Sequence, residues 1–101
     1  MVKSIKFVNE KEFQQKIEDQ DFLLAQAIVE SIIENINISK INVHLLEIEC
    51  EEEGIIYDYS LDKNKFALTL KENLFHYLKN EKYEKCTKIE NIIKQLENEQ
   101  K

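Results

Sequence analysis

The sequence contains no Pro, no Trp and no Arg, and it has a single Gly. One Gly excludes the Gly-rich loops that bind phosphates, and the absence of Pro excludes proline-rich ligand segments. Without Arg the chain lacks the bidentate donor that reads guanine edges and binds phosphates. No apolar run is long enough to cross a membrane, and the N-terminus shows no signal-peptide pattern. We therefore expect no direct contact with nucleic acid, no contact with a membrane, and no export.

Charge is abundant in this chain, with an acidic excess. Asp and Glu number 20 against 14 basic residues, all of them Lys, which gives a net charge of −6 and a pI near 5.0. Such a chain repels a phosphate backbone. Hydrophobic residues make up 43 % of the sequence, the proportion of a folded domain. We expect residues 1–101 to form a single domain, because two halves would each be too small for a core.

The acidic excess is concentrated in one short segment. Between positions 47 and 58 there are six acidic residues and no basic one, so this segment alone accounts for the net charge of −6. The six are Glu47, Glu49, Glu51, Glu52, Glu53 and Asp58. Such a cluster attracts a basic partner at short range and in a salt-dependent way. We identify these side chains as candidate partner-binding residues, with a merely solvated loop as the alternative.

The N-terminal part predicts a short strand followed by one or two helices. Residues 2–8 alternate weakly between apolar and polar side chains, as a strand does. Asn9 followed by Glu12 forms a capping box, which predicts a helix that begins directly after Asn9. Asp19 or Asp21 is expected to interrupt this helix and to cap a second one.

The second helix, predicted over residues 22–36, is apolar around most of its circumference. A helix of this kind is either central in the domain or half of a homodimer interface. We expect Leu24, Ile28 or Ile32 to lie in such an interface. The narrow polar stripe includes Glu30 and Glu34, which we interpret as an exposed stripe rather than an acid–base pair.

Residues 41–50 and 55–61 predict an antiparallel β-hairpin. Gly54 is the natural turn residue because it tolerates a positive φ. We expect a two-residue loop of Glu53 and Gly54.

This loop fixes the expected register of the hairpin. The apolar pairs are then Cys50 with Tyr57, Ile48 with Tyr59, and Leu46 with Leu61. Glu49 lies across from Asp58 on the opposite, acidic face. The apolar residues before Leu45 are out of phase with those after it, which predicts a β-bulge near Leu45.

The C-terminal part predicts a helical hairpin or one long helix. Thr69 and Glu72 form a second capping box, which predicts a helix start there. Residues 79–82 are the expected break, after which apolar residues recur at near-heptad spacing to Leu96.

Residues 70–96 resemble the UVR-type helical hairpin of nucleotide-excision-repair proteins and some bacterial protease adaptors. The matching positions are Leu70, Leu74, Tyr83-Glu84, Cys86, Ile89, Ile93 and Leu96. In that family the hairpin is a protein-docking element, so the resemblance implies partner binding and no chemistry. The exposed aromatic anchors of such a docking surface would be Tyr77 and Tyr83.

Two His and two Cys would suffice in number for a zinc site, but their spacing argues against one. His44 and Cys50 share a predicted strand and lie about 20 Å apart at about 3.3 Å per residue. His76 and Cys86 could meet across a turn, although two ligands do not complete a site. The acidic segment also lacks the ordered calcium-loop pattern. We expect no metal, no cofactor and no catalytic residue. Both cysteines are expected to be buried and reduced. A Cys50–Cys86 disulfide is the alternative.

The sequence therefore predicts a small cytoplasmic, non-enzymatic protein-binding module of the α+β class. In the first interpretation it is an adaptor or inhibitor whose acidic face covers the basic surface of a partner, such as a nucleic-acid-binding protein. In the second, the C-terminal helices dock on the partner. In the third, the chain is a structural homodimer assembled through residues 22–36. The preference for Lys, Ile and Asn is compatible with a low-GC bacterium or its phage.

Overall fold

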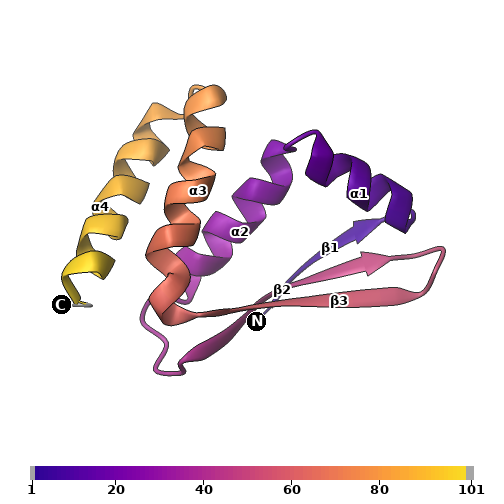
Figure 1. Ribbon diagram of the computed structural model, residues 1–101, viewed down its shortest axis with the longest axis horizontal. Helices are drawn as coiled ribbons and strands as arrows, with labels where there is room; N and C mark the ends of the chain where they lie inside the picture. The colour runs from indigo at the N-terminus through magenta and orange to yellow at the C-terminus, as the bar shows by residue number, and fades with distance from the viewer. Residues whose placement is uncertain (1, 100–101) are drawn as a thin grey trace.

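The computed structural model describes residues 2–99 and has the predicted α+β class (Figure 1). A short strand and two helices precede a β-hairpin, and two antiparallel helices end the chain. In chain order the elements are β1 (Lys3–Phe7), α1 (Glu10–Glu18), α2 (Phe22–Glu34), β2 (Asn42–Cys50), β3 (Ile55–Asp62), the 3-10 turn η1 (Lys63–Lys65), α3 (Phe66–Lys79) and α4 (Tyr83–Glu99).

The three strands form one sheet in the order β1-β2-β3, so β2 is the central strand. β1 pairs parallel with β2, and β3 pairs antiparallel with it. Helices α1 and α2 make the crossover that a parallel pair requires. In Figure 1, α3 and α4 lie side by side at one end of the molecule, and the turn of the β2–β3 hairpin lies at the other end.

The core lies between one face of the sheet and the helices. Along β2, buried side chains from Leu46 to Cys50 alternate with partly exposed ones, which shows that only one sheet face is covered. The most deeply buried side chains include Ile32, Leu46, Phe66, Leu70 and Tyr77. On the opposite face Ser4, Lys6 and Asp58 are exposed.

Capping signals placed the first two helices correctly. The Asn9 side chain accepts a hydrogen bond from the Glu12 backbone N–H at 2.9 Å, so α1 begins as predicted. Asp19 is the C-cap of α1. Asp21 is the N-cap of α2 and accepts from the Leu23 N–H at 2.8 Å. Both predicted roles of the aspartates, interruption and recapping, are therefore confirmed.

The second capping prediction was wrong. α3 begins at Phe66 rather than at Thr69, and Thr69 is buried inside the helix. Phe66 and Ala67 are buried in the core, and burying them in helical conformation extends α3 past the local Thr-x-x-Glu signal. The break predicted at residues 79–82 is confirmed, which makes the tail a helical hairpin.

The turn between α3 and α4 holds a non-Gly residue in left-handed conformation. Glu81 has a φ of 58°. Its N–H donates to the Leu78 carbonyl at 3.0 Å, and the Lys82 N–H donates to the Tyr77 carbonyl at 2.9 Å. These two bonds form a Schellman-type helix end, which normally places Gly at the left-handed position.

We predict that Glu81→Gly raises the free energy of unfolding by about 0.5–1 kcal/mol, because Gly removes the left-handed strain. Glu90→Gly, at an exposed position inside α4, is the control and should lower it by about 1 kcal/mol. Urea unfolding monitored by circular dichroism measures both. A loss of stability in Glu81→Gly would contradict the assignment of strain to this turn.

The hairpin register differs from the prediction by two residues. The turn spans Glu51 to Gly54, and Gly54 adopts a φ of 64° with its N–H donating to the Glu51 carbonyl at 3.2 Å. Gly54 is thus the last residue of a four-residue turn, not the second of a two-residue loop. The observed pairs are Cys50 with Ile55, Ile48 with Tyr57, Leu46 with Tyr59, and Glu47 with Asp58. An even shift leaves each side chain on its predicted face.

The predicted bulge is confirmed, with the register shift between His44 and Leu46. Leu45 is the extra residue and is buried in the core.

Helix α2 uses most of its apolar surface inside its own chain. Ile32, one of the residues expected at a dimer interface, is fully buried in the core, and Val29 is buried beside it. Leu24 and Ile28 are half-buried, and Leu23 is 71 % exposed. These observations favour the interpretation of α2 as a central core helix over its interpretation as a homodimer interface. No helix in the described part of the chain is long and apolar enough to span a membrane.

Candidate functional site

The hairpin formed by β2, its turn and β3 carries the acidic charge of the protein. Residues 42–62 contain seven Asp or Glu residues and no Lys. All six predicted partner-binding residues lie on this hairpin, but the structure divides them between two places. Glu47, Glu49 and Asp58 share the face of the sheet opposite the core, whereas Glu51, Glu52 and Glu53 lie in the turn.

The face opposite the core is not purely acidic. The parallel pairing of β1 with β2 places Lys6 directly beside Glu49, and their charged atoms Nζ and Oε2 are 3.8 Å apart. Asp58 has a nitrogen neighbour on this face, because its Oδ1 lies 3.3 Å from Nε2 of His44. Lys6 was not expected here, because the contact depends on pairing with a strand more than forty positions away in the sequence.

Two of the turn acids stabilise the start of helix α1. The Glu53 carboxylate accepts a hydrogen bond from the Glu10 backbone N–H at 3.0 Å. Glu52 accepts one from the Asn9 side-chain amide at 3.2 Å. A carboxylate at a helix N-terminus is favourable because it faces the positive end of the helix dipole. Glu52 and Glu53 therefore have a structural role besides any role in binding.

The side-chain carboxylates of Glu47 and Glu51 have no hydrogen-bond or ion-pair partner among residues 2–99. Glu51 is exposed at the turn. A second acidic group lies close by, because the carboxylate of Glu10 accepts a hydrogen bond from the Tyr57 hydroxyl. The same bond raises the pKa of Tyr57 above its usual value. The turn end of the hairpin therefore brings Glu10 close to the three turn acids, and among these four carboxylates only that of Glu51 has no hydrogen-bond partner within residues 2–99.

Strand β3 is an edge strand, and its outer edge pairs with no other strand in the described residues. Most of its eight residues are exposed. Ile56 is 58 % exposed, and Ile55 and Tyr57 beside it are also exposed. The strand contains no Pro and no Lys, which are the residues that usually protect an edge. Sequence reasoning missed this feature, because the order of strands in a sheet is not a local property.

The alternative docking residues Tyr77 and Tyr83 have opposite environments. Tyr77 is 1 % exposed and belongs to the core, so it is not the surface anchor that we predicted. Its ring makes an edge-to-face contact with Phe22, with centroids 4.9 Å apart. Tyr83 is 61 % exposed at the start of α4 and remains available for contact.

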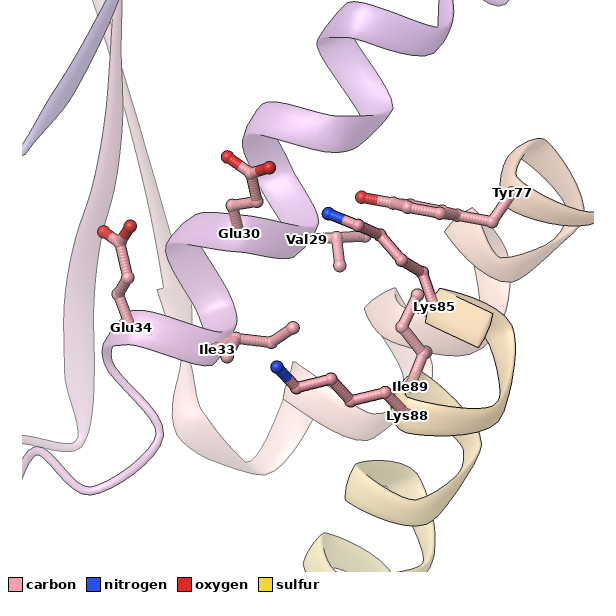
Figure 2. Close-up of a pocket in the computed structure, with 8 residues that line it drawn as sticks. All are labelled: Val29, Glu30, Ile33, Glu34, Tyr77, Lys85, Lys88 and Ile89. Carbon is pink, nitrogen blue, oxygen red and sulfur yellow. The ribbon is translucent and has the colours of Figure 1, made fainter. Parts of the chain in front are cut away.

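A shallow cleft of about 170 Å³ lies between α2 and α4 (Figure 2). Lys85 and Lys88 extend into it from α4, while Glu30 and Glu34 line it from α2. Those two carboxylates lie 3.6 and 3.2 Å from Nζ of Lys3. Lys3 is therefore the ion partner of both Glu30 and Glu34. The hydrogen bond with Glu34 raises the pKa of Lys3 above its usual value. The cleft is smaller than the ~300–1,000 Å³ of usual small-molecule sites.

Both cysteines are free thiols buried in the structure. Burial raises the pKa of Cys50 and also that of Cys86. A raised pKa keeps a thiol protonated, whereas a nucleophilic cysteine needs a lowered one. Comparison of the chain with protein-family models, with curated proteins and with solved structures gives no match.

Proposed function

We propose that the protein is a non-enzymatic interaction module, an adaptor or an inhibitor, that binds an extended basic segment of a partner protein along the free edge of β3. The observation that carries this proposal is an exposed, unprotected edge strand on a hairpin with seven acidic residues and no Lys. The proposal includes a reducing, cytoplasmic setting, in keeping with the two free thiols.

The edge supplies the affinity in this proposal. Backbone N–H and C=O groups on the outer edge of β3 can pair with an incoming strand, and alternate side chains of that strand meet the exposed apolar residues. Ile56 and Tyr57 lie on opposite faces of β3 and are both exposed, so the incoming strand finds apolar contacts on either side.

Charge supplies the selectivity. Glu51 at the turn and Glu47 on the outer face have no internal partner, and the hairpin as a whole is strongly negative. A basic segment is attracted to this field, whereas acidic segments and nucleic acids are repelled. Basic segments of nucleic-acid-binding proteins have this chemistry.

A second candidate surface lies on the helical hairpin. Leu68, Phe75 and Leu78 are exposed on α3, and Tyr83 is exposed on α4. These apolar side chains are consistent with the docking role that the UVR-type resemblance implies, and that relationship remains a prediction. In this alternative the acidic hairpin only keeps the protein in solution.

To test the first proposal, a labelled eight-residue peptide of alternating Lys and Val is titrated into the full chain at low and high salt. We expect binding at low salt that weakens as salt rises. On binding, hydrogen exchange should slow at the backbone amides of β3 that point to its outer edge. The double variant Glu49→Gln/Glu51→Gln should weaken binding by roughly 1 kcal/mol, or about fivefold.

The matched control is Glu84→Gln/Glu90→Gln, which removes the same charge from exposed positions on α4. It should leave the affinity nearly unchanged, and a peptide of alternating Glu and Val should not bind. Equal losses in both double variants would show attraction to net charge alone. Slowed exchange in α3 and α4, with none in β3, would favour the helical hairpin instead.

A further inference from the structure

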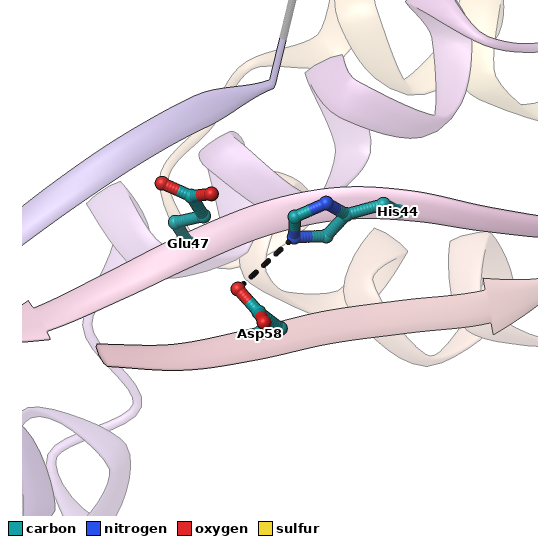
Figure 3. A group of neighbouring side chains, drawn as sticks. All are labelled: His44, Glu47 and Asp58. Carbon is teal, nitrogen blue, oxygen red and sulfur yellow. Dashed lines mark ion pairs between the residues drawn. The ribbon is translucent and has the colours of Figure 1, made fainter. Parts of the chain in front are cut away.

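Three side chains of metal-ligating type meet on the outer face of the hairpin. His44 and Glu47 come from β2, and Asp58 comes from β3 (Figure 3). One ligand atom from each residue lies within 4.8 Å of the other two. The group shares Glu47 with the acidic field of the proposed function, but it includes neither Glu51 nor the backbone groups on the outer edge of β3.

The β-bulge is what brings the histidine into this group. In a regular strand, residues three apart point to opposite faces, so His44 and Glu47 would lie on different sides of the sheet. The extra residue Leu45 changes this phase, because His44 pairs with Ser60 while Leu46 pairs with the next residue, Tyr59. Bulges re-aim side chains in this way next to functional sites.

The histidine nitrogen in the group has unmet bonding capacity. Nε2 of His44 is buried from solvent and has no hydrogen-bond partner of good geometry, although Asp58 Oδ1 lies 3.3 Å away. A buried polar atom without a hydrogen bond calls for a partner such as an ion. Glu47 and Asp58 are directly opposite each other in the register, an arrangement of like charges that destabilises a sheet and that a bound cation would relieve.

We propose that His44, Glu47 and Asp58 bind a divalent transition-metal ion, with Zn²⁺ as the best match. The imidazole favours a transition metal over Ca²⁺ and Mg²⁺, which take oxygen ligands. Ligands about 2.1 Å from a tetrahedral zinc lie about 3.4 Å from one another. Rotation of the flexible Glu47 side chain, which is only partly buried, closes the remaining gap. Three protein ligands leave the fourth position open to water or to a donor from another molecule.

The test uses the full chain after removal of metal with a chelator, and no peptide is present. Calorimetric titration with Zn²⁺ should give one ion per chain. His44→Ala, Glu47→Gln and Asp58→Asn should each weaken binding by at least about tenfold, since even outer-shell changes cost about 10–100-fold. Glu49→Gln is the matched control, with the same charge change on the same strand outside the group, and should alter affinity by less than about twofold.

Wild-type protein alone also decides the question, because the chain has only two histidines. In NMR spectra of the imidazole protons, Zn²⁺ should shift the signals of His44 and leave those of His76 in place. Absence of binding, an equal response of both histidines, or an equal loss in Glu49→Gln would each overturn the proposal. None of these outcomes depends on whether a basic peptide binds the edge of β3.

Discussion

Replacing Tyr77 with Ala should lower the free energy of unfolding by about 3–5 kcal/mol, the cost of removing a large aromatic side chain from a core. Tyr77 is 1 % exposed and contacts the ring of Phe22. Burial, with the negative charge of Glu30 as a smaller cause, raises the pKa of Tyr77 to about 12. The hydroxyl therefore stays protonated at neutral pH, and truncation removes a neutral packed ring.

Tyr83→Ala is the matched control, since Tyr83 is the same residue type at the end of the same helical hairpin but is 61 % exposed. Its effect on stability should stay within about 0.5 kcal/mol. Urea unfolding followed by circular dichroism measures both variants. A loss below about 1 kcal/mol in Tyr77→Ala would contradict its placement in the core and would restore it as a surface anchor for a partner.

Signals contained in a few consecutive residues predicted the local structure well. Asn9 and Asp21 cap helices because their side chains reach backbone N–H groups two or three residues away. The phase change around Leu45 predicted the bulge because inward and outward positions alternate along any strand. The Thr69 cap failed although its motif is also local, since burial of Phe66 outweighed the motif.

Features that depend on distant segments were not predicted. The sequence does not show that β1 pairs with β2, so Lys6 was not expected beside Glu49. The register error arose at the turn, where a single Gly serves either a two-residue or a four-residue turn. The acidic residues were correctly assigned to one hairpin, but their division between the turn and the outer face follows from the four-residue turn, which leaves Glu51 and Glu52 outside the strand.

The group of His44, Glu47 and Asp58 had a signal in the sequence that our reasoning did not use. We weighed the histidines only against the two cysteines and expected no metal. A bulge near Leu45 had already been predicted, and it implies that His44 and Glu47 share a face. Asp58 could be added to the group only with the true register of the hairpin, in which Asp58 lies opposite Glu47.

Replacing Ile32 with Ala should lower the free energy of unfolding by about 2–5 kcal/mol, by the same amount at every protein concentration. Ile32 is fully buried within its own chain, so the truncated side chain leaves a cavity inside one molecule. This prediction separates the central core helix from the homodimer proposed through residues 22–36. In a dimer held together by this residue, stability would depend on protein concentration by mass action.

Leu23→Ala on the same helix is the control, because Leu23 is 71 % exposed. It should change stability by no more than about 0.5 kcal/mol. Thermal unfolding of both variants and the wild type at micromolar and at hundredfold higher concentration measures the effect, and sedimentation equilibrium gives the molecular mass. If the midpoint of the wild type rises with concentration and Leu23→Ala abolishes that rise, α2 forms an interface after all. A constant midpoint with a large loss in Ile32→Ala leaves the hairpin and the α3–α4 pair as the surfaces available to a partner.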